Sequence, residues 1–183
     1  MRPYDEPIIT FRVLLRGYCE AVERFHASAQ TEPIPGILAL FEALNWAVTL
    51  DDRVAKHWAP AGTQRVEPDG NIKPAIPGKK WLERWCGDQT VTRAIRFARN
   101  RVHYQWAEAL EPDSTDPPQV EWSWRSTVDL PPAPPDRPDR DGGNAYDTLL
   151  AGHPVASTLA SIQDLYSQFA DLLEPNLGAP TTI

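Results

Sequence analysis

Cysteine is scarce in this sequence. Cys19 and Cys86 are its two cysteines, and they form neither a C-x-x-C pair nor a disulfide framework. The four histidines show none of the paired spacing that is typical of a zinc site. We therefore expect a reducing compartment, the cytoplasm, and a protein that uses neither a metal nor a cofactor.

Long hydrophobic runs are missing as well. No stretch reaches the roughly 18 consecutive apolar residues that a membrane-spanning helix needs. The chain begins with MRPYDEP, which lacks the basic start and the apolar core of a signal peptide. We expect no membrane association. The length of 183 residues fits one domain over 1–183, with a core large enough to need no disulfide or metal.

Lysine is rare, and positive charge is concentrated in one segment. The chain has 4 Lys against 14 Arg, a ratio that is typical of GC-rich genomes. In its general distribution of Trp, Pro and Arg it resembles actinobacterial proteins. The formal net charge of −7 argues against a protein that coats duplex DNA. Residues 79–101 nevertheless carry +5, whereas residues 1–78 carry −2 and residues 102–183 carry −10. An anionic ligand is therefore expected to bind within 79–101.

Proline is abundant, and its 19 positions divide the chain. Because proline lacks the N–H group of a helix interior, long helices are expected between prolines. Four intervals repeat apolar residues three and four positions apart, as amphipathic helices do. We expect helices over 7–33, 36–58, 88–110 and 154–174, and a shorter helix from the cap Asn144 to Gly152, with Gly142 and Gly143 in the loop before it.

These intervals predict an all-α fold, a bundle of four to five helices. Two irregular segments interrupt it, a loop over 59–80 and a proline-rich strap over 111–141. Within the strap, a period-two alternation predicts a short β element near 120–129, with Trp122 and Trp124 on one face. Their rings either pack over the apolar side of the bundle or stack on nucleic-acid bases.

The basic segment contains the strongest functional candidates. With about 100° of rotation per residue, four polar side chains fall within about 100° of one another, on a face that the core does not need. A histidine can transfer a proton near neutral pH, an arginine can pair with a phosphate, and an asparagine can orient a ribose or phosphate oxygen. RNA cleavage needs no metal, because the adjacent 2′-hydroxyl is the nucleophile. The four residues are Arg96, Arg99, Asn100 and His103.

This pattern resembles the HEPN domain (higher eukaryotes and prokaryotes nucleotide-binding). The motif of that family is an Arg separated from a His by four to six residues, often with Asn directly after the Arg. Arg96 has six residues before His103, whereas the Arg99–Asn100 pair has three, so either arginine is a candidate. The resemblance implies a metal-independent ribonuclease, formed by two such helices in a homodimer, in a defence or toxin system. It implies catalytic roles for Arg96, Arg99, Asn100 and His103 and RNA contacts for Arg93 and Arg101.

Two plainer interpretations stay open. The same face can be a solvated surface whose charges answer the acidic C-terminal third. Alternatively, the protein is a non-enzymatic subunit of a phage-derived or defence assembly, in which the Trp strand and the proline-rich strap contact a protein partner and the basic helix docks to an acidic surface. Asp51 and Asp52 with Glu42 do not complete a metal site. For the two aspartates we favour a polar helix face on which they pair with Arg53 or Lys56.

Overall fold

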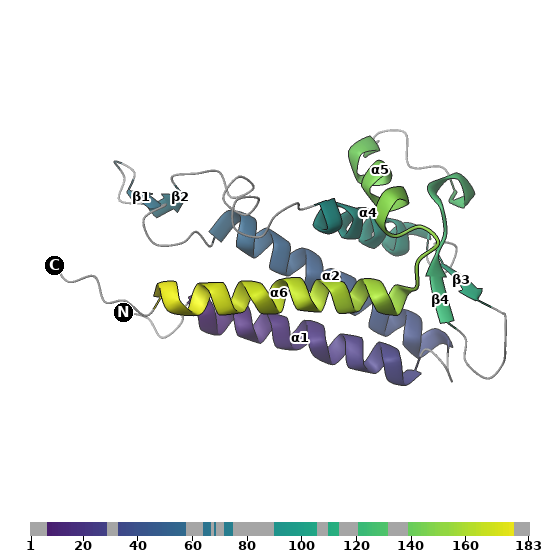
Figure 1. The fold of residues 1–183 in the computed structure, drawn as a ribbon, viewed down its shortest axis with the longest axis horizontal. Coiled ribbons are helices and arrows are strands. Elements are labelled where there is room, and N and C mark those ends of the chain that lie inside the picture. The colour runs from purple at the N-terminus through teal and green to yellow at the C-terminus, as the bar shows by residue number, and fades with distance from the viewer. Residues whose placement is uncertain are drawn as a thin grey trace.

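The fold is described by a computed structural model that covers residues 7–28, 33–57, 64–66, 68, 72–74, 90–105, 110–113, 121–131 and 139–177. Five α-helices in this part of the chain pack together, which confirms the all-α fold. In Figure 1, α1, α2 and α6 run along the long axis of the molecule, and α4 and α5 lie together on one side of α2. The helices are α1 (Pro7–Ser28), α2 (Pro33–His57), α4 (Thr90–Gln105), α5 (Arg140–Leu149) and α6 (Val155–Leu177).

Two small antiparallel ribbons accompany the helices. Strand β3 (Leu110–Asp113) pairs with β4 (Glu121–Trp124), which confirms the β element near 120–129, and a 3-10 turn follows at Thr127–Asp129. Strand β1 (Gln64–Val66) pairs with β2 (Ile72–Pro74), inside the segment predicted to be a loop. That prediction was incomplete, because the sequence Pro-Asp-Gly at 68–70 is itself a turn signal between two short strands.

Three helix boundaries differ from those predicted. Helix α2 starts at Pro33 rather than at residue 36. The predicted span of 88–110 for α4 is wrong at its end, because Leu110 pairs with Trp124 in the β3–β4 ribbon; residues 88–89 and 106–109 of that span lie outside the described residues. Helix α6 continues past Pro175, since a proline in the last turn removes a single hydrogen bond to the carbonyl four residues earlier.

The start of α5 was predicted wrongly. Its N-cap is Asp139, not Asn144, and the Asp139 carboxylate accepts a hydrogen bond from the backbone N–H of Gly142 at 2.9 Å. Gly142 and Gly143 therefore belong to the helix rather than to a loop. A Cβ atom on Gly142 would collide with the capping carboxylate, so the glycine allows the cap to close.

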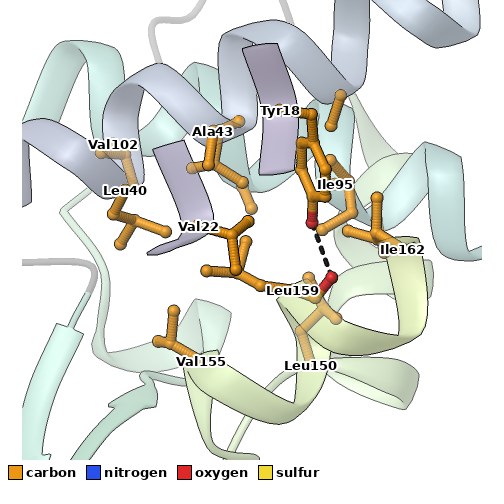
Figure 2. Close-up of a cluster of buried hydrophobic side chains, with 14 of the residues drawn as sticks. Tyr18, Val22, Leu40, Ala43, Ile95, Val102, Leu150, Val155, Leu159 and Ile162 are labelled. Carbon is orange, nitrogen blue, oxygen red and sulfur yellow. Dashed lines mark hydrogen bonds between the residues drawn. The ribbon is translucent and has the colours of Figure 1, made fainter. Parts of the chain in front are cut away.

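Apolar side chains from all five described helices, from the β3–β4 ribbon and from the turn before α6 meet in one core, part of which is drawn in Figure 2. Among the apolar residues of the predicted helices, Phe41 is partly buried and packs against this core. Five others are buried in it: Leu44, Ile95, Val102, Ile162 and Phe169. In Figure 2 the labelled residues are Tyr18 and Val22 of α1, Leu40 and Ala43 of α2, Ile95 and Val102 of α4, Leu150, and Val155, Leu159 and Ile162 of α6.

Two buried tyrosines tie helices together through their hydroxyl groups. Tyr18 of α1 donates a hydrogen bond to the carbonyl of Leu159 in α6 at 2.6 Å, the dashed line in Figure 2. Tyr166 of α6 donates to the carbonyl of Ala47 in α2 at 3.0 Å. Both hydroxyls are thus satisfied inside the core, and burial raises the pKa of each tyrosine well above its ordinary value.

The β3–β4 ribbon is attached to the core by Trp124. This side chain is fully buried, and its indole N–H donates a hydrogen bond to the hydroxyl of Thr158 in α6 at 3.0 Å. Its backbone also bonds to His153 and Gly152, in the turn between α5 and α6. Trp122 is partly buried against the same core. The structure therefore supports packing as the role of the two rings.

Helix α2 is the most apolar element. Among the described residues, its stretch Ile34–Arg53 is long and apolar enough to cross a membrane by length and composition, with a mean hydropathy of 1.2. The core helix of a soluble protein passes the same test. In this structure 44% of the stretch is buried, and it supplies buried residues such as Leu40, Leu44 and Leu50 to the core.

Candidate functional site

Helix α4 lies between two other helices, with α2 and α5 as neighbours. Its buried side consists of Ala94, Ile95, Phe97, Ala98 and Val102. The described residues of the predicted polar face, Arg96, Arg99 and Asn100, are half-buried, and α2 packs beside them. The site is therefore built at the α2–α4 contact.

Arg96 is bound by two carboxylates of α2. Its Nη2 lies 2.5 Å from Asp51 Oδ2 and 2.9 Å from Asp52 Oδ1, and 37% of its side chain is exposed. Burial lowers the pKa of the guanidinium, but the hydrogen bonds to the two aspartates outweigh it and raise the pKa overall. The aspartates were expected to pair with Arg53 or Lys56 on their own helix; the structure adds Arg96 of α4 as a partner, and the side chain of Lys56 lies outside the described residues.

Arg99 has neutral partners instead. Its Nε donates a hydrogen bond to Asn45 Oδ1 at 3.0 Å, and its Nη1 donates to Asn100 Oδ1 at 2.9 Å. Both acceptors are amide oxygens, so the guanidinium is oriented while its positive charge is not offset by them. The structure thus brings Arg99 and Asn100, which the sequence placed on one face, into direct contact.

Asn45 is a site residue that sequence reasoning missed. Its own Nδ2 donates to the carbonyl of Phe41 at 2.9 Å, which turns the amide oxygen towards Arg99. A signal was present in the sequence: polar residues interrupt the apolar stretch of α2 at helical spacing, which marks a second polar face. These residues are Glu42, Asn45, Thr49 and Asp52.

The other two predicted RNA contacts are Arg93 and Arg101. Arg93 is half-buried on α4, about one turn before Arg96. Arg101 places its guanidinium 5.1 Å from the centre of the Phe97 ring, and its Nη1 donates to the carbonyl of Pro131 at 3.1 Å. Burial lowers the pKa of Arg101, against a smaller opposing effect of Tyr146. The guanidinium of Arg101 therefore holds Pro131 of the strap against α4.

The backbone of α4 extends through residue 103, so this position lies one turn beyond Arg99 and Asn100 along the helix. The side chain of His103 lies outside the described residues. Two other histidines, His26 and His153, are exposed. Within the described ranges, no three His, Cys, Asp or Glu side chains gather as a metal site would require.

Comparisons with protein-family models, with curated proteins and with solved structures return no match to this chain. The resemblance to the HEPN family stays a prediction, carried by the Arg, Asn and His positions of α4.

Proposed function

We propose that this protein binds RNA through one row of residues on α4, namely Arg99, Asn100 and His103. The observation that carries the proposal is the setting of Arg99, which is held from two sides by amide oxygens that leave its charge in place. An arginine that is ordered before the ligand arrives loses less side-chain entropy when it binds a phosphate.

Arg99, rather than Arg96, is the arginine that we assign to the phosphate. Arg96 lies within 2.9 Å of two carboxylates, which offset its charge and would repel an approaching anion. Arg99 also stands directly before Asn100, as the arginine of the HEPN motif often does. Its spacing to His103 is one residue shorter than in that motif.

The same row supports metal-independent cleavage. His103 takes the proton of the 2′-hydroxyl, whose oxygen attacks the neighbouring phosphorus, and O5′ leaves with a proton from a second copy's histidine or from water. Arg99 stabilises the charge of the phosphorane. Asn100 accepts a hydrogen bond from Arg99 through its oxygen and so offers its amide nitrogen to a phosphate oxygen. The products are a 2′,3′-cyclic phosphate and a 5′-hydroxyl.

The charge distribution favours a local contact with single-stranded RNA. The chain as a whole carries −7, so long-range attraction to nucleic acid is weak, while the segment 79–101 carries +5. Binding confined to a few phosphates is expected, with an affinity that falls as salt rises. A cytoplasmic defence or toxin system is the setting we propose.

The test is a binding and cleavage assay with labelled single-stranded RNA at low ionic strength in EDTA. The parent protein should bind, and His103→Ala should lower any cleavage rate by about 10² to 10⁴ while binding persists. Arg99→Ala should lower the cleavage rate and, in contrast to His103→Ala, also weaken RNA binding. Arg16→Ala is the matched control, because Arg16 lies on the exposed side of α1, paired with Glu20. Thermal melting of each variant verifies the fold.

The outcomes separate the functional classes. Binding without cleavage identifies an RNA-binding module and removes the ribonuclease assignment. Neither binding nor cleavage by folded parent protein overturns the proposal and favours the non-enzymatic subunit of an assembly.

A further inference from the structure

The α2–α4 contact holds two arginines of α4 in chemically different ways. Arg96 meets two aspartates, whereas Arg99 meets the amide of Asn45. A charge-assisted pair is stronger than a hydrogen bond to a neutral amide, so a contact that served only to join the helices would gain from a carboxylate at both places. The neutral residue stands at the arginine to which we assign the phosphate.

The orientation of Asn45 is fixed by α2 itself. Its Nδ2 donates to the carbonyl of Phe41 at 2.9 Å, and a carbonyl oxygen can accept from the amide nitrogen but not bond to the amide oxygen. The oxygen of Asn45 must therefore face away from Phe41, towards Arg99 Nε at 3.0 Å. Thr49 donates to the carbonyl of Asn45 at 2.8 Å, one turn further along the helix.

The donors of Arg99 can be counted. A guanidinium has five N–H groups, of which Nε bonds to Asn45 and one hydrogen of Nη1 bonds to Asn100. The second hydrogen of Nη1 and the two of Nη2 remain for a ligand. These groups form the terminal fork that binds two oxygens of one phosphate.

We propose that Asn45 is a positioning residue: it holds Arg99 by its Nε edge with a neutral acceptor, so that the terminal fork and the full positive charge are presented to a phosphate of the RNA. This inference rests on the proposed function and adds a residue of α2 to it. Asn45 itself makes no contact with the RNA.

The test compares Asn45→Asp with Asn144→Asp, which makes the same chemical change at an exposed position of α5. Affinity for a single-stranded oligoribonucleotide is measured by fluorescence anisotropy over a range of salt, together with the thermal midpoint. Asn45→Asp should keep or raise the thermal midpoint, since it pairs with Arg99. It should weaken RNA binding about tenfold at low salt, as the loss of one charge-assisted hydrogen bond implies. It should also reduce the slope of log affinity against log salt by the amount that corresponds to one phosphate contact. Asn144→Asp should match the parent.

A second variant, Asn45→Thr, keeps the site neutral but removes the hold on Nε. It should weaken binding without changing the salt dependence, because Arg99 keeps its charge. A purely structural role would lower the thermal midpoint of both variants and leave both the RNA affinity of the folded protein and its salt dependence unchanged. If Asn45→Asp does not fold, the threonine variant decides the question by itself.

Parent-like affinity in the folded variants at position 45 overturns this inference and leaves the proposed function standing. Absence of RNA binding by the parent overturns both.

Discussion

The indole ring of Trp46 in α2 lies directly against Gly17 in α1, so that a Cβ atom at residue 17 would come within 2.8 Å of the ring. This is closer than side-chain carbons pack, so the glycine is what allows the two helices to approach at this point. Trp46 is held in place by its Nε1, which donates to Glu42 at 3.3 Å.

Replacing Gly17 by alanine should therefore destabilise the protein. At an ordinary helix position this change stabilises by about 1 kcal/mol, but here the overpacking against Trp46 should cost about 1 to 3 kcal/mol. Urea unfolding measures the difference. The double variant Gly17→Ala with Trp46→Leu should lose less unfolding free energy than the sum of the two single variants, because the smaller leucine removes the clash with the new methyl group. A Gly17→Ala protein more stable than the parent would show that the helices can separate at no cost.

The hydrogen bond from Trp124 to Thr158 gives a second prediction. Thr158→Val removes the acceptor at nearly constant volume and leaves the buried indole N–H without its partner. We expect a loss of about 1 to 3 kcal/mol in unfolding free energy. Thr148→Val on the exposed side of α5 is the matched control and should stay within about 0.5 kcal/mol of the parent. Equal losses in both variants would mean that the bond does not contribute.

The buried tyrosines predict a loss of stability in alkali. In the unfolded chain Tyr18 and Tyr166 ionise near pH 10, whereas in the folded protein burial raises their pKa and keeps them protonated. The unfolded state therefore releases protons first, and stability that is complete below pH 10 falls as the pH rises above it. Each tyrosine should contribute about 1.4 kcal/mol per pH unit.

Denaturant midpoints from pH 9 to 11 measure this slope. Tyr18→Phe changes the stability at neutral pH through the lost hydrogen bond, so the slope is the quantity to compare. The slope should be shallower in Tyr18→Phe than in the parent. Identical slopes would contradict the assignment of alkaline sensitivity to Tyr18.

The helices could be predicted from the sequence because their signals are local. Apolar spacing between prolines located each long helix, and the alternation around Trp122 and Trp124 located β4. The partner strand β3 could not be found this way, since Leu110 fits the end of a helical stripe equally well and its pairing with Trp124 is a contact between distant residues. Asp139 could not be predicted as the N-cap of α5, because it stands near the end of the proline-rich strap, where no apolar helical spacing precedes Gly142 and Gly143.

The candidate site was predictable in part for the same reason. That Arg96, Arg99 and Asn100 share a face follows from the geometry of one helix. That α2 covers this face depends on how two helices pack, and their mutual register has no local signal. The difference in partners, Asp51 for Arg96 and Asn45 for Arg99, depends on that packing and could not be read from the sequence.

The proposed contact of Arg99 with RNA is tested most directly by the salt dependence of binding. The logarithm of the affinity for single-stranded RNA is plotted against the logarithm of the salt concentration for the parent, for Arg99→Gln and for Arg16→Gln, which removes the same charge from the exposed side of α1. Arg99→Gln should reduce the slope by about 0.7, the value for one phosphate contact on a single strand, while Arg16→Gln keeps the slope of the parent. Equal slopes for Arg99→Gln and the parent would contradict the claim.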